Sequence, residues 1–231
     1  MRTTTAQAAE RGATLALLPF AATLGYYALP AQLQTQRFVQ FAPQIIAYLA
    51  FALWAALNRT VLSRFGLEKH KLGQGGKIGL STGLLLGGLN SLVILRAFPN
   101  WGYDITFLKD APHAQLPVLV MVPWLIVGIA LFVEVNFRGF LLGRLAVLES
   151  NFWNLPSIRH LSPLALVTSA FVFAFDPFMV NTFRHLHWIA VWDGLIWGII
   201  WLRTGNLYAT IIAHATEVII VYSAVRSVLM S

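Results

Sequence analysis

Long apolar segments alternate with short polar segments along most of the chain, and this alternation predicts helices that cross a membrane. A helix that spans the hydrocarbon core needs about 20 predominantly apolar residues. We expect one helix at each of the apolar segments 12–29, 38–57, 78–97, 116–134, 162–176, 188–202 and 207–228, and a further helix over 136–150. The expected fold is therefore all-α, a polytopic transmembrane helical bundle of about seven to eight helices.

The composition agrees with a protein that lies in a bilayer. Of the 231 residues, 58% are hydrophobic and 11% are charged, whereas about 25% of a soluble domain is charged. The net charge is +7. Because the basic residues lie between apolar segments, they indicate topology and contact with anionic lipids rather than binding of nucleic acid. The chain has no cysteine, which excludes disulfides, thiolate metal sites and a cysteine nucleophile.

The distribution of lysine and arginine predicts the orientation in the membrane. Segment 58–77 carries five basic residues and one acidic residue, Glu68. Because cytoplasmic loops are enriched in Lys and Arg, we place this segment and the N-terminus in the cytoplasm. The lack of a large extramembrane domain favours a bacterial inner (plasma) membrane, and the sequence gives no oligomeric state.

Small residues recur at every fourth position near the start of the third apolar segment, at Gly75, Gly79, Gly83 and Gly87. On a helix these glycines form a ridge that allows another helix backbone to approach closely. We therefore expect helix packing there, either within one chain or between subunits.

Four of the nine acidic residues lie within apolar segments or at their ends: Glu134, Asp176, Asp193 and Glu217. A charged side chain at the centre of a membrane helix costs about 2.5–3.5 kcal/mol on insertion scales. We therefore expect these carboxylates to converge on an internal polar cavity. Glu134 and Arg138 are four residues apart, so they share a helix face and can form an ion pair. Such a pair is either part of a functional site or a structural feature at the membrane edge.

His214 and His185 are further candidates for a functional site. His214 and Glu217 are three residues apart, which suits a shared metal ion, a shared proton or a hydrogen bond that packs two helices. His185 lies in a polar loop, where it either reaches the same cavity or lies with Trp188 at the membrane surface. A small transporter or proton relay is a further reading of the buried acids, although no internal repeat supports it.

Three stretches of the C-terminal half carry a recognisable order and spacing. The first is Val133-Glu134-Val135-Asn136-Phe137-Arg138-Gly139, the second is 169–177, and the third combines 202–207 with His214 to Val218. Together they resemble the motifs Glu-Glu-x-x-Phe-Arg-Gly, Phe-x-x-x-His and His-x-x-x-Asn of the CAAX-protease and bacteriocin-processing (CPBP) family of intramembrane metalloproteases. The resemblance covers about 116–220. It divides the chain into N-terminal helices with a basic loop over 1–115 and a protease-like core over 116–231.

The chain departs from the family at three positions. Val133 stands where the family has the glutamate that activates water, Pro177 where it has a histidine, and Val218 where it has an asparagine. The resemblance therefore implies the fold more directly than the activity.

The resemblance implies an intramembrane metallo-endopeptidase that acts on a membrane-associated peptide at the cytoplasmic side, as in CAAX-type processing. Its catalytic residues would be Glu134, Arg138 and His214. Zinc would be held by His214, Glu217 and Asp176, with Asp193 and His185 lining the cavity. The alternative is a catalytically inactive relative that binds a membrane peptide or a lipid on the same scaffold.

Overall fold

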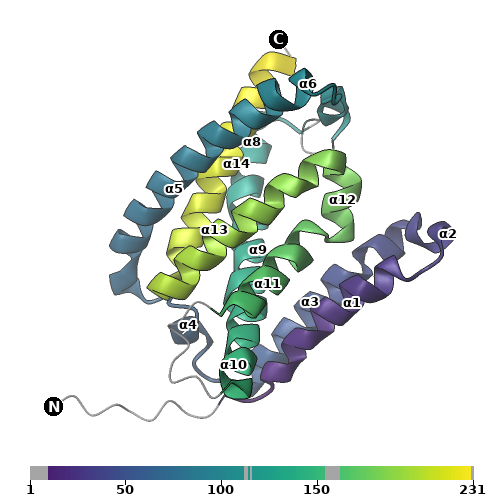
Figure 1. Ribbon diagram of the computed structural model, residues 1–231. Helices are drawn as coiled ribbons and strands as arrows, with labels where there is room; N and C mark the ends of the chain where they lie inside the picture. Colours follow the sequence, from purple (N-terminus) through teal and green to yellow (C-terminus); the bar gives the residue numbers. More distant parts are fainter. Residues whose placement is uncertain (1–9, 112–113, 115, 154–161, 230–231) are drawn as a thin grey trace.

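The computed structural model describes residues 10–111, 114, 116–153 and 162–229. All regular secondary structure in these ranges is helical, and the predicted all-α fold is confirmed. The long helices run side by side as a bundle, with helices from the two halves of the chain interleaved (Figure 1).

The N-terminal part contributes a packed pair of apolar helices, 17–27 and 37–57, and a further long helix, 72–92. Pro30 and Gln36 lie at the starts of the short helix and the long helix that follow the first turn. The helical elements of this part are η1 (Ala13–Ala16), α1 (Leu17–Tyr27), α2 (Ala31–Gln34), α3 (Arg37–Leu57), α4 (Val61–Arg64), η2 (Lys69–Lys71), α5 (Leu72–Leu92), η3 (Val93–Ala97), α6 (Phe98–Asn100) and η4 (Thr106–Asp110). Helices α1 and α3 pack together, whereas α5 lies against the last helix of the chain.

The middle of the chain forms one long helical rod in which α-helical and π-helical turns alternate. Its elements are α8 (Val118–Pro123), η5 (Trp124–Leu131), α9 (Phe132–Glu134), η6 (Val135–Leu142) and α10 (Gly143–Phe152). Segments η5 and η6 are π-helical. Such turns are rare and are frequently found at functional sites, and the three-residue α9 between them ends at Glu134.

The C-terminal part folds into a helical segment, 163–174, that is bent relative to the next one, 177–204, and a long last helix, 207–229. Its elements are α11 (Pro163–Ala174), α12 (Pro177–Phe183), η7 (Arg184–Trp188), α13 (Ile189–Thr204) and α14 (Leu207–Leu229). Gly205 ends α13 with a left-handed backbone at φ 56°, a conformation that glycine adopts without a steric penalty. The expected turn at 203–206 is therefore present.

The membrane spans differ in length from the expected ones. Among the residues that the structure describes, four helical segments are long and apolar enough to cross a membrane: 37–57, 61–100, 118–152 and 207–229. The expected spans at 162–176 and 188–202 belong to α11 and to the segment 177–204, which are bent by 51° relative to each other and together count as one further candidate. The expected first span is a shorter apolar helix, 13–27. The expected helix break at 154–156 lies outside the described residues.

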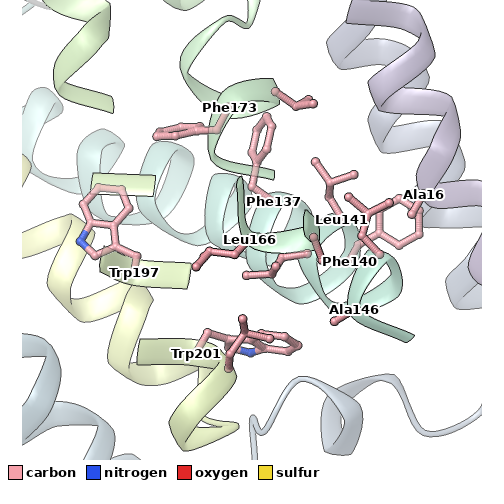
Figure 2. Close-up of a cluster of buried hydrophobic side chains, with 14 of the residues drawn as sticks. Ala16, Phe137, Phe140, Leu141, Ala146, Leu166, Phe173, Trp197 and Trp201 are labelled. Atoms are coloured by element: carbon pink, nitrogen blue, oxygen red, sulfur yellow. The ribbon is translucent and has the colours of Figure 1, made fainter. Parts of the chain in front are cut away.

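Aromatic side chains fill the centre of the bundle. Trp54, Phe65 and Phe140 are almost fully buried, with ring centroids 5.6–5.7 Å apart for the two pairs that involve Trp54. Figure 2 shows Phe137, Phe140 and Leu141 of the rod among these buried apolar side chains. This packed core fixes the rod against the helices on both sides, and so positions Glu134.

The glycine ridge packs within the chain, against α14. A Cβ atom added at Gly79 would lie 2.6 Å from the carbonyl oxygen of Ala209, and one at Gly83 would lie 2.6 Å from that of Ala213. Real Cβ atoms essentially never come within 3.0 Å of another heavy atom, so the helix backbones are as close as they are because these positions lack side chains. The expected packing role is confirmed.

Replacing Gly79 by alanine should therefore lower the free energy of unfolding by roughly 1–3 kcal/mol, since the added methyl group meets backbone that cannot move aside cheaply. The control is Gly88→Ala on the same helix, because a Cβ at Gly88 meets no atom within 4 Å. Denaturant unfolding of both variants in the same detergent measures the difference. Equal stabilities of the two variants would contradict this account of the ridge.

Candidate functional site

Glu134 lies at the centre of the candidate site and is fully buried. Its Oε1 atom lies 3.0 Å from Nδ1 of His214 and 3.1 Å from Nη1 of Arg138. The pair with Arg138 joins residues four apart on the rod, as the sequence spacing predicted, whereas the contact with His214 joins the rod to α14. Two of the motif stretches therefore meet at one carboxylate.

The second oxygen of this carboxylate is available. Within the part of the chain that the structure describes, Oε2 of Glu134 is buried and meets no donor in good hydrogen-bond geometry, and the hydroxyl of Thr210 is the other polar group beside the carboxylate. An ionised carboxylate accepts hydrogen bonds at both oxygens. A water molecule or a polar group of a ligand therefore finds an unused acceptor beside His214.

Arg138 is held by aromatic rings as well as by Glu134. Its guanidinium carbon lies 4.5 Å from the ring centroid of Phe173 and 5.0 Å from that of Trp197, a geometry that favours a cation over an aromatic face. Gly194 lies alongside, since a Cβ there would be 3.5 Å from Nη2 of Arg138. The positive charge is thus fixed next to the Glu134 carboxylate, where it compensates the buried negative charge.

The imidazole of His214 is oriented by a stacking contact. Its ring centroid lies 4.4 Å from that of Trp197, with the two planes 22° apart. Nδ1 faces the Glu134 carboxylate, so it carries the proton and donates to Oε1. The carboxylate and the stacked ring together set one orientation and one tautomer for this histidine.

A second polar cluster adjoins the first and is centred on Asn90 of α5. The amide nitrogen of Asn90 lies 3.2 Å from both carboxylate oxygens of Asp193 and 2.7 Å from Oε1 of Glu217. Its amide oxygen accepts a hydrogen bond of 3.0 Å from Nε1 of Trp192. Arg138 interacts electrostatically with both acids. Three of the four acids expected to converge, Glu134, Asp193 and Glu217, therefore belong to one buried polar region.

Sequence reasoning missed Asn90, although a signal was present. The residue lies three positions after Gly87 and so continues the helix face of the glycine ridge. A polar side chain on the face of closest packing indicates a hydrogen-bonded contact with the neighbouring helix.

Asp176 and His185 lie apart from this region. Asp176 caps the N-terminus of α12, since its Oδ1 accepts hydrogen bonds from the backbone nitrogen of Phe178 at 3.0 Å and from Nε2 of Gln44 at 2.8 Å. The His185 ring packs instead among the aromatic rings of the segment 98–107, with its centroid 4.9–5.5 Å from those of Phe98, Tyr103 and Phe107. Neither residue joins Glu134 and His214.

The described residues do not form a zinc centre of the expected kind. No group of three His, Cys, Asp or Glu side chains among them is arranged to hold a metal ion. Asp176 is used as a helix cap and lies apart from the other two residues, so only His214 and Glu217 remain as candidate ligands. A zinc ion usually needs at least three protein ligands, so His214, Glu217 and Asp176 do not fit it in this arrangement.

An apolar groove of about 390 Å³ lies on the same rod. It is formed by α8, η5 and α9, and Phe132, at one end of its lining segment, is two residues before Glu134 in the chain. The residues that line it are Val120, Pro123, Trp124, Val127, Gly128 and Phe132. Trp124, Val127 and Phe132 are about half exposed, as expected of a helix face that contacts membrane lipid, whereas Glu134 is fully buried and faces the other way.

Comparison with known proteins agrees with this arrangement of motifs. No curated protein and no solved structure matches the chain. A family model described as "Type II CAAX prenyl endopeptidase Rce1-like" matches residues 115–220, a range that contains Glu134, Arg138 and His214 and that ends before the C-terminal part of α14. The resemblance to the CPBP family is thereby confirmed, since residues 115–220 of this membrane protein match the Rce1-like family model.

Proposed function

We propose that this protein is an intramembrane endopeptidase of the CAAX type, in which Glu134 is the general base. The observation that carries the proposal is the buried contact between Glu134 and His214, which brings two family motifs together and leaves Oε2 of Glu134 without a partner. The family match to type II CAAX prenyl endopeptidases supports the same reaction class.

Peptide hydrolysis in such a site needs a base that removes a proton from water and a group that stabilises the oxygen anion formed on the carbonyl. Oε2 of Glu134 has the free acceptor position that the first role requires. His214 is suited to the second role, because a histidine held by a carboxylate at one nitrogen presents its other nitrogen in a fixed direction. Arg138 places its positive charge next to the Glu134 carboxylate.

The substrate class that the site favours is a peptide that carries a hydrocarbon chain. The matched family is named for prenylated CAAX substrates, and the apolar outer face of the rod contacts the lipid in which a prenyl chain would lie. A prenyl chain would remain in the surrounding lipid while the adjoining peptide enters the polar region. We therefore propose a prenylated, membrane-associated peptide as the substrate.

Replacing Glu134 by glutamine should lower the turnover of a farnesylated CAAX peptide by about 100- to 10,000-fold, because an amide cannot act as a general base. Glutamine preserves the size of the side chain and can still accept from His214. A matched control is Glu68→Gln, which alters a carboxylate near the surface that pairs with Lys71. If Glu134→Gln folds and cleaves at the parental rate, the proposal is wrong.

A non-catalytic binding protein is the second candidate, and the side chains at the three departing positions favour it. Val133 packs against the apolar core and Pro177 is buried in the first turn of α12, so neither position supplies a group for hydrolysis. This candidate expects the purified protein to bind the farnesylated peptide without cleaving it. It also expects Glu134→Gln to leave that binding unchanged.

Zinc binding is tested separately. Because His214, Glu217 and Asp176 do not assemble as ligands, we expect His214→Ala and Glu217→Ala to leave the zinc content of the purified protein unchanged. A chelator should likewise leave the melting temperature unchanged. Elemental analysis of the parent and the two variants checks this, and one zinc ion per chain that is lost in either variant would contradict it.

A further inference from the structure

The Asn90 side chain joins three helices at a single buried amide. It is fully buried on α5 and contacts Asp193 of α13 and Glu217 of α14. Carboxylates only accept hydrogen bonds and an indole nitrogen only donates them. The amide nitrogen must therefore face the two acids, while the amide oxygen faces Trp192. Each polar atom of the amide is used, and its orientation is unique.

The contacts of this amide lie one helical turn from the proposed reactive groups. On α14, His214 precedes Glu217 by three residues. On α13, Trp197 follows Asp193 by four. Residues at these spacings share a helix face. The stacking of His214 on Trp197 is therefore the next layer of the same α13–α14 contact, and whatever fixes Asp193 against Glu217 also fixes the height and rotation of His214.

The electrostatics strengthen this coupling. Asp193 and Glu217 are 3% and 5% exposed, and their side chains hydrogen-bond to each other as well as to Asn90, which needs one carboxyl proton between them. Asn90 supplies donors to both. Arg138 is paired with Glu134 and acts on both acids only through its charge, whereas the Asn90 amide contacts them directly. The Asn90 amide and the Asp193–Glu217 hydrogen bond together join α5, α13 and α14 at this level.

We propose that Asn90 is a positioning residue that holds His214 in place against Glu134 by bridging Asp193 and Glu217. Asn90 lies outside residues 115–220, so the N-terminal half of the chain completes a site whose other parts lie in the family-like half. The role in cleavage rests on the proposed peptidase function, whereas the positioning of His214 does not.

A reciprocal exchange of side chains tests the proposal. Asn90→Asp places a third carboxylate among the acids and removes the donor. Asp193→Asn, added to it, restores one amide and one carboxylate with their roles reversed. With a farnesylated CAAX peptide we expect Asn90→Asp to lower kcat about 100-fold, the size of effect that a displacement of 1 Å can cause. KM should change little, and the double variant should recover most of the parental kcat.

The ¹⁵N resonances of the His214 ring give a readout that needs no substrate. We expect them to shift in Asn90→Asp and to return towards the parental values in the double variant. Gly88→Ala on the same helix is the control and should leave them in place. If the parent does not cleave peptides but the resonances behave as expected, the peptidase function fails while the positioning role stands.

Two results would overturn the proposal. One is a double variant as impaired in kcat and as shifted in the His214 resonances as Asn90→Asp alone. The other is an Asn90→Asp protein that loses thermal stability while its His214 resonances, and the kcat of its folded fraction, stay at the parental values. The second result would mean that Asn90 serves folding only.

Discussion

The close approach of α5 to α14 is the contact on which the polar centre of this protein depends. Bare helix faces at Gly79 and Gly83 bring the two backbones to a distance that no side chain permits. In a bilayer, apolar burial gives helices little reason to associate, so packing of this kind and buried hydrogen bonds supply the stabilisation. The ridge also decides which polar group reaches the centre, since Asn90 follows Gly87 on the same face.

The buried polar groups form two linked layers, and each has a different means of balancing its charge. In the first, Glu134 is balanced by Arg138 and oriented by His214. In the second, two acids are bridged by one neutral amide. Isolated ionised groups are expensive in a membrane, and this pairing explains how a short chain carries three carboxylates inside its bundle. The layers depend on each other because α13 and α14 run through both.

Local patterns in the sequence predicted the parts of this arrangement that lie within one helix. Glu134 and Arg138 pair because they are four residues apart on one rod, and the glycine ridge follows from its regular spacing. The contacts of Asn90 are different, since they join residues 103 and 127 positions apart, and no local pattern specifies such distances. Asp176 was open to a better interpretation: an aspartate directly before a proline is typical of a helix N-cap, and it is a cap.

Two of the residues that depart from the family motifs, Pro177 and Val133, have structural roles in this fold. Where the family has a histidine, Pro177 occupies the first position of α12, and its fixed backbone angle suits a helix start. The neighbouring Asp176 is then needed as the cap and is lost to the site. At the start of the first motif, Val133 contributes apolar packing to the core. The hydrolytic groups that remain are therefore those that the rod and α14 bring together, Glu134 and His214.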